Sequence, residues 1–268
     1  MKIGSLCTGY GGLDMAVEAY FNAEMVWCAE IDKYASQLIT KRFNKPNHGN
    51  IKTIDWNQLE SIDILTAGYP CQPFSHAGYR KGSDDERHLW PYIKEAISIL
   101  RPNIVVLENV RGHLSLGFKE VLAELTEIGY DAKWKIVRAS DVGAPHQRAR
   151  LFIVAYPNSK RLQRKSNQRY TTTKCSVINT CIEHQPHDRK MSQLRQRFTS
   201  RFEMHLQTLP HALDKNRVSA QFVEYMMGLP QGWVTDIDIS WTQQLKMLGN
   251  GVVPQQAYFA LHQLLCVI

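Results

Sequence analysis

Hydrophobic positions along the chain form short apolar runs that alternate with amphipathic stretches. Apolar runs of roughly four to eight residues bounded by glycine, proline or charged residues are typical of buried strands, whereas apolar residues three or four apart are typical of helices. These patterns predict strands over 2–6, 25–29, 62–67, 104–109, 132–138 and 151–155. They predict helices over 13–21, 33–43, 91–100, 118–128 and 255–265. One more should begin after Ser219, with Phe222, Met226 and Leu229 as an apolar stripe that faces the core.

Strands that alternate with helices in this way predict an α/β fold with a doubly wound, mostly parallel sheet. Such sheets place their chemistry in the loops at the carboxyl ends of parallel strands, because the scaffold holds each loop while its tip stays accessible. Reactive side chains at the ends of the predicted strands are therefore the first candidates for a functional site.

The strand predicted over 62–67 is followed, four residues later, by a cysteine that stands between two prolines. Gly68, Pro70 and Pro73 prevent the strand from continuing, so Cys71 should lie on a rigid loop. A lone cysteine is more often buried and inert. Here, however, two more strand patterns bring polar groups to the same region.

The strand predicted over 104–109 contains Glu108 near its end, and Arg148 and Arg150 lead into the strand over 151–155. A thiol, a carboxyl group and two guanidinium groups should therefore converge. The alternative for the arginines is a structural ion pair with an Asp or Glu.

The segment Gly68-Tyr-Pro-Cys-Gln-Pro-Phe-Ser75 resembles the nucleophile block of the cytosine-C5 DNA methyltransferase family, bacterial or phage type. Further blocks at 5–14, 103–110, 145–155 and 248–254 follow in the family's order. The resemblance implies a Rossmann-like catalytic and cofactor-binding domain over 1–155 and a variable, basic target-recognition region over 156–215. Residues 216–268 would form a buttress and a C-terminal helix that returns to the catalytic domain.

The resemblance also implies a mechanism and its residues. A Cys71 thiolate would add to C6 of a cytosine flipped out of double-stranded DNA, while the Glu108 carboxyl acts at N3. Arg150 aligns with the family arginine near the cytosine carbonyl, and Arg148 with its neighbour. S-adenosyl-L-methionine would be the methyl donor.

The expected cofactor site begins in the glycine loop after the first strand, where missing side chains would leave room for the methionine moiety. Glu30, at the end of the second strand, would accept hydrogen bonds from the ribose. Its alternative is a solvated carboxylate at a helix N-terminus, a role that suits Asp32 better. The implied cofactor-binding residues are Cys7, Gly9, Gly11, Gly12, Leu13, Glu30, Ile31, Asn50, Ile51, Pro70, Asn250 and Val252. Two of them depart from the family: many members have Phe at the position of Cys7 and Asp at that of Asn50.

The chain carries a net charge of +7, with a pI near 9.1, and most of the excess lies between residues 160 and 201. This charge favours a polyanionic partner. The basic stretch is either a disordered insert or a recognition region whose Lys and Arg contact phosphates while a few side chains read bases. A tRNA-cytosine methyltransferase and a catalytically inactive DNA-binding module remain the alternatives.

Other features bear on location and partners. No apolar stretch is long enough to span a bilayer, and the first residues lead into a strand instead of a signal peptide, so we expect a cytoplasmic protein. Six scattered cysteines agree with a reducing compartment. Cys175, Cys181, His184 and His187 lack the spacing of common zinc fingers, so no metal is expected. We expect a monomer, with a cognate restriction endonuclease as a candidate partner.

Overall fold

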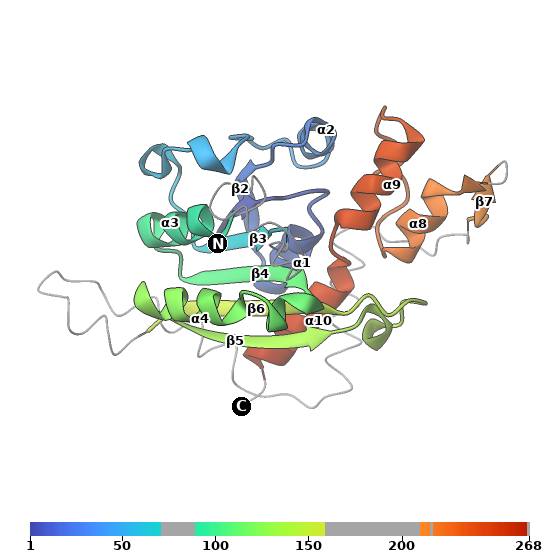
Figure 1. Ribbon diagram of the computed structural model, residues 1–268. Helices are drawn as coiled ribbons and strands as arrows, with labels where there is room; N and C mark the ends of the chain where they lie inside the picture. The colour runs from blue at the N-terminus through green and yellow to red at the C-terminus, as the bar shows by residue number, and fades with distance from the viewer. Residues whose placement is uncertain (71–88, 159–209, 215–216, 267–268) are drawn as a thin grey trace, which may run out of the picture.

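The computed structural model describes residues 1–70, 89–158, 210–214 and 217–266. Cys71, most of the predicted recognition region and the four Cys and His residues considered for zinc lie outside these ranges. The described residues form a six-stranded sheet in the order β2-β1-β3-β4-β6-β5 (Figure 1). Its strands are β1 (Lys2–Leu6), β2 (Glu24–Ala29), β3 (Ile64–Gly68), β4 (Ile104–Val110), β5 (Tyr130–Val137) and β6 (Arg150–Pro157).

The direction of the strands confirms the predicted doubly wound, mostly parallel sheet. β1 pairs in parallel with β2 and β3, and β3 pairs in parallel with β4. β6 is antiparallel to both of its neighbours, β4 and β5. The strand order reverses at β1, which is the place where open α/β sheets bind ligands.

Helices cover both faces of the sheet because successive strand residues point to opposite sides. Ile64 and Val106 share one core with α1 (Gly12–Phe21) and α10 (Pro254–Leu265). Leu65 and Leu107 share another core with α3 (Trp90–Leu100) and α4 (Phe118–Glu127). Strands buried on both faces explain why the sequence shows continuous apolar runs instead of alternation.

The first and last helices of the described chain pack together on one face of the sheet. α10 begins at Pro254, where a proline is well tolerated, and packs against α1 and β5 (Figure 1). The rings of Tyr20 and Tyr258 lie edge to face, 5.3 Å apart. The last described helix therefore packs beside the first one.

Helix α2 (Lys33–Arg42) begins as the sequence predicted. The side chain of Asp32 accepts hydrogen bonds from the backbone N–H groups of Tyr34 and Ala35, at 2.9 and 3.2 Å. Asp32 is therefore an N-cap, which leaves Glu30 available for another role.

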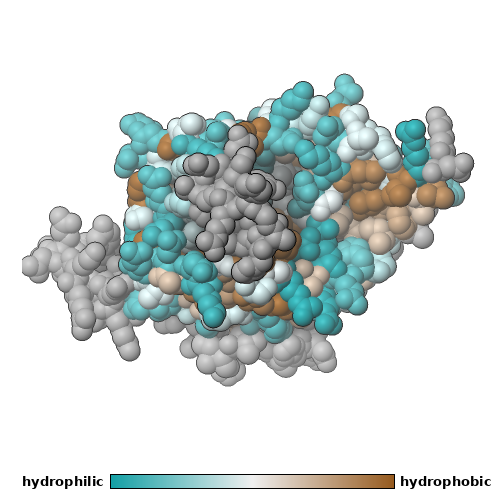
Figure 2. Space-filling view, in the orientation of Figure 1, coloured by the Kyte–Doolittle hydropathy of each residue, from teal (hydrophilic) through white to brown (hydrophobic). Residues whose placement is uncertain are grey.

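The segment after residue 209 forms a short hairpin, β7 (Leu213–Asp214) and β8 (Arg217–Val218), followed by α8 (Ala220–Met226) and α9 (Trp241–Asn250). Ser219 caps α8 as predicted. The expected apolar stripe is core only at Leu229, because Phe222 and Met226 are half-buried. Figure 2 shows apolar side chains gathered over α8 and the hairpin, where Leu213 is 60% and Val218 47% exposed.

In place of that stripe, α8 turns a carboxylate inward. Glu224 is 2% exposed and accepts hydrogen bonds from the backbone N–H groups of Gly232, Val234 and Thr235, at 2.7, 2.6 and 3.0 Å. The Thr235 hydroxyl donates to it as well, at 3.0 Å. This carboxylate holds the turn between α8 and α9 in shape.

Among the described residues, no helix combines the length and the apolar composition needed to cross a membrane.

Replacing Glu224 by Ala should lower the free energy of unfolding by about 2–4 kcal/mol, because three backbone donors lose a buried, charged acceptor. Urea denaturation of the full chain would measure this. Glu95→Ala, at an exposed position of α3, is the control and should change stability by about 0.5 kcal/mol or less. Equal stability of the Glu224 and Glu95 variants would contradict the role given to this carboxylate.

Candidate functional site

The antiparallel direction of β6 brings the candidate residues to one edge of the sheet. β3 and β4 end there, with Gly68 paired to Glu108. β6 starts there, with Arg150 paired to Val110. Since Glu108 and Val110 lie on the same face of β4, the side chain of Arg150 is placed beside Glu108. Cys71, three residues beyond Gly68, lies outside the described residues.

Glu108 and Arg150 form a buried ion pair. The Nε atom of Arg150 lies 3.0 Å from Oε1 of Glu108, whose residue is only 7% exposed. Burial raises the pKa of Glu108 to about 7, although the nearby charges of Arg150 and Arg148 lower it. Near neutral pH the carboxyl group therefore exists in both protonation states, as a group that delivers a proton requires.

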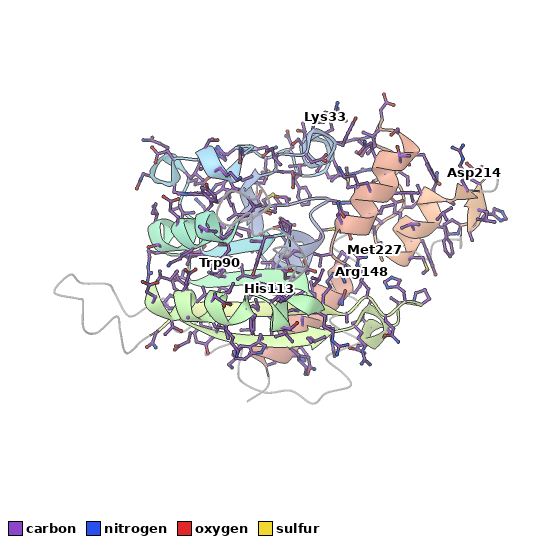
Figure 3. All side chains as sticks on the ribbon, in the orientation of Figure 1. Lys33, Trp90, His113, Arg148, Asp214 and Met227 are labelled. Carbon is purple, nitrogen blue, oxygen red and sulfur yellow. The ribbon has the colours of Figure 1, made fainter. Side chains whose placement is uncertain are left out.

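Arg148 lies at the same edge but points elsewhere. Its Nη2 donates to the carbonyl oxygens of Gly249 and Gly251, at 2.6 and 2.7 Å, on either side of Asn250. Its φ of 34° lies in the left-handed region, and Gln256 Nε2 donates to its carbonyl at 2.8 Å. Figure 3 shows Arg148 beside the turn between α9 and α10. The two arginines that the sequence analysis grouped together therefore have different partners. Arg150 contacts Glu108, whereas Arg148 holds the turn before α10.

Tyr69, which directly follows β3, is held by side chains from the end of β4 and from the segment after it. Asn109 Nδ2 donates to the carbonyl oxygen of Tyr69 at 3.1 Å. The Tyr69 hydroxyl lies 3.0 Å from Nε2 of His113, which is 0% exposed. These contacts anchor the chain two residues before Cys71.

A cavity of about 870 Å³ opens at this edge of the sheet. This size suits a nucleoside-containing ligand. The predicted cofactor residues that line it are Cys7, Gly9, Gly12, Leu13, Glu30, Ile31, Asn50, Ile51, Pro70, Asn250 and Val252. Glu108 and Arg150 line it too, so the ion pair and the predicted cofactor residues share one cavity. Gly11 and Arg148 are not among its lining residues.

Two glycines of the loop before α1 are required for packing within the protein. A Cβ atom at Gly11, whose φ is 81°, would lie 2.4 Å from the Phe43 ring. A Cβ atom at Gly12 would lie 2.1 Å from the Val252 carbonyl oxygen. At Gly9 a Cβ atom would meet nothing within 4 Å. The expectation that all three glycines leave room for a ligand therefore applies to Gly9, while Gly11 makes room for an aromatic ring.

The hydrogen-bond acceptors in the cavity fit S-adenosylmethionine. Glu30 accepts from the backbone N–H groups of Gly9 and Asp32, both at 2.8 Å, and each oxygen keeps lone pairs for ribose hydroxyls. The oxygen of Asn50 accepts from the Lys52 N–H at 3.0 Å and can accept a second hydrogen bond. The Ile31 side chain is 73% exposed beside them, available to pack on a planar base.

The structure adds a buried acid that the sequence analysis did not single out. Asp14 lines the cavity, is 1% exposed and accepts from the Thr66 hydroxyl at 2.5 Å. Burial raises the pKa of Asp14 to about 7. The pattern that could have revealed it is an acid directly after Leu13, inside the apolar part of the first predicted helix.

Within the described part of the chain, no three or more His, Cys, Asp and Glu side chains are grouped so that they could hold a metal ion.

Known proteins resemble this chain in sequence and in fold. The family model for C-5 cytosine-specific DNA methylase matches residues 1–219. Type II methyltransferase M.BsuFI of Bacillus subtilis is 32% identical over 188 residues, which cover 68% of this chain and 45% of that protein. Type II methyltransferase M.Bsp6I of Bacillus sp. strain RFL6 is 31% identical over 229 residues, 74% of this chain and 73% of that protein.

The fold also matches that of a solved structure, a DNMT2 mutant of Spodoptera frugiperda, with a TM-score of 0.67 and 18% identity over 98% of this chain and 99% of that one. At this level of identity the match concerns the fold alone. The match of the family model to residues 1–219 of 268 covers most of the chain. The chain therefore belongs to the C-5 cytosine-specific DNA methylase family.

Proposed function

We propose that this chain is a DNA (cytosine-5-)-methyltransferase, which methylates carbon 5 of cytosine in duplex DNA with S-adenosylmethionine as the donor. The observation that carries the proposal is the buried Glu108–Arg150 pair, which lies in the same cavity as the cofactor-type acid Glu30. One pocket thus offers both a proton-donating carboxyl and a nucleoside site. Family membership supports the same reaction.

The chemistry assigned to the protein is activation of an unreactive ring. Carbon 5 of cytosine is a poor nucleophile, and a thiolate of Cys71 that bonds to C6 would convert C5 into an enamine carbon. Glu108 would donate its proton to N3, so that negative charge does not build up on the ring. Arg150 would hold the Glu108 carboxyl in place and face the cytosine carbonyl.

Bound S-adenosylmethionine would supply an electrophilic methyl group to C5. A base must then remove the proton from C5, so that the bond between C6 and sulfur breaks and the Cys71 thiolate leaves. Glu30, with Asn50 and Ile31, would hold the adenosine part of the cofactor. Asn250 lies in the turn whose flanking carbonyls are fixed by Arg148.

The target base has to leave the duplex stack before this reaction, at a cost of a few kcal/mol. We assign the compensating binding energy and the choice of sequence to the basic region 156–215, whose Lys and Arg would contact phosphates. The relatives are named Type II methyltransferases, which supports a cognate restriction endonuclease as partner. We further propose that the protein acts as a monomer.

A duplex containing 5-fluorocytosine tests the proposed covalent step. The fluorine cannot be removed as a proton would be, so the wild-type protein should become trapped on the DNA, as seen by denaturing gel electrophoresis. Cys71→Ala should abolish both trapping and tritium transfer from labelled S-adenosylmethionine, and Cys266→Ala is the control that should retain both. Turnover by the Cys71 variant would refute covalent catalysis at this residue.

The single-turnover rate of methyl transfer should depend on the protonation of Glu108. The protonated fraction falls as pH rises through its pKa of about 7, so this contribution to the rate is present below pH 7 and lost above it. Glu108→Gln should abolish this pH dependence and lower the rate by about two to four decades, with little change in DNA affinity. Glu120→Gln, exposed on α4, should behave as wild type. An unchanged rate in Glu108→Gln would exclude the proton-donor role.

Loss of the Glu30 carboxylate should weaken S-adenosylmethionine binding by about one to two decades, because hydrogen bonds to a charged group contribute roughly 1.5–3 kcal/mol. Isothermal titration calorimetry with Glu30→Ala would measure the change. The control is Glu60→Ala, since Glu60 pairs with Lys2 outside the cavity. Equal affinity of the two variants would remove Glu30 from the cofactor site.

A further inference from the structure

The cavity has two walls that come from opposite ends of the chain. One is the glycine loop 8–12 before α1, and the other is the turn 249–252 before α10; both contribute lining residues. The side chain of Tyr10 joins them directly. The hydroxyl of Tyr10, in the glycine loop, donates to the carbonyl oxygen of Val252 at 2.7 Å. Tyr10 is 0% exposed, so no water competes for this hydrogen bond.

The backbone of Tyr10 is held from another direction by the connection between α8 and α9. The indole Nε1 of Trp233 donates to the carbonyl oxygen of Tyr10 at 2.9 Å. Trp233 is fixed in turn by Arg42, whose Nε donates to the Trp233 carbonyl at 2.9 Å and whose guanidinium lies over the indole at 5.4 Å. Phe43 packs edge to face on the same indole, with ring centres 5.7 Å apart. Tyr10 is thus held at both its carbonyl and its hydroxyl group.

The ring of Tyr10 also fills the space between the walls. A Cβ atom at Gly251 would lie 1.8 Å from the Tyr10 ring, so the turn packs directly against it. Arg148 also donates to the carbonyl oxygens of Gly249 and Gly251. The turn is therefore held both by packing against the Tyr10 ring and by hydrogen bonds from the Arg148 guanidinium.

We propose that Tyr10 is a positioning residue for the cofactor site: it sets the separation of the two walls, and Trp233 anchors it there. The inference rests on the proposed function, because it takes S-adenosylmethionine as the ligand of this cavity. A cavity whose walls are already fixed binds its ligand without a cost of ordering them. Loss of the hydrogen bond from the Tyr10 hydroxyl to Val252 frees the turn 249–252. Part of the free energy of cofactor binding is then used to order this turn.

The chain offers a closely matched control for this hydroxyl. Tyr130 is 1% exposed, and its hydroxyl donates to the carbonyl oxygen of Pro102 at 2.7 Å, at a site that does not line the cavity. Tyr10→Phe and Tyr130→Phe each remove one buried hydroxyl-to-carbonyl bond of the same length. A purely structural role for Tyr10 would make the two variants behave alike.

Calorimetric titration of the full-length wild type and both variants with S-adenosylmethionine tests the proposal. Tyr10→Phe should raise the dissociation constant roughly tenfold, while Tyr130→Phe leaves it unchanged. The two variants should lose similar thermal stability. In activity assays Tyr10→Phe should raise KM for S-adenosylmethionine but not for DNA. Trp233→Phe, which keeps an aromatic ring but lacks the N–H donor, should weaken cofactor binding in the same direction.

Three results would contradict the proposal. Wild-type affinity in Tyr10→Phe would overturn it, and so would equal weakening in Tyr10→Phe and Tyr130→Phe, which marks a general loss of stability. A wild-type protein that does not bind S-adenosylmethionine would overturn the proposed function and this inference together. The first two results leave the proposed function intact, so the two failures are distinguishable.

Discussion

The contact between Glu108 and Arg150 depends on the one strand that runs against the others. In an all-parallel sheet, Arg150 at the start of β6 would lie at the amino-terminal edge, a strand's length away from the end of β4. Because β6 is antiparallel to β4, the guanidinium lies 3.0 Å from the Glu108 carboxyl. Burial alone would leave that carboxyl neutral over a wide pH range, and the nearby cations bring its pKa back to about 7.

Three of the buried acids among the described residues, Asp14, Glu108 and Glu224, have different surroundings and therefore different properties. Glu224 accepts hydrogen bonds from three backbone N–H groups, which is a structural role. Asp14 accepts a hydrogen bond from the Thr66 hydroxyl. Burial is the largest influence on its carboxyl group and raises its pKa. Glu108 lies in the cavity with a guanidinium partner. Of these three acids, Glu108 is the one whose charge is balanced by a cation at the proposed reaction site, which agrees with a role in proton transfer.

The cavity depends on contacts between the first and the last parts of the described chain. Its glycine loop belongs to the first strand-helix unit, yet Val252, Gly251 and Trp233 from the last part of the chain pack against it. Gln256 of α10 also donates to the carbonyl oxygens of Val137 and Arg148, both at 2.8 Å. The C-terminal part of the chain therefore contacts the arginine segment as well as the cavity.

The sequence by itself determined most of the elements, although it predicted neither α9 nor the hairpin of β7 and β8. Continuous apolar runs identified the strands of the six-stranded sheet, including the one that contains Glu108 near its end. Asp32 and Ser219 marked helix starts because their side chains cap backbone N–H groups close by in the chain. The block pattern identified the family, and eleven of the twelve residues that it implied for the cofactor line the cavity. Burial was predicted less well on α8, where Glu224 points inward and Met226 is half-buried.

Only the tertiary structure decided which groups meet. Gly11 makes room for Phe43, Arg148 turns to the carbonyls around Asn250, and Tyr10 bonds to Val252 across a sequence separation of 242 residues. Hydrophobic periodicity and caps report on a residue's own helix or strand, because they arise from contacts within a few positions. They carry no information on partners far away in the sequence, and it is these partners that give Arg148 and Tyr10 their places in the site.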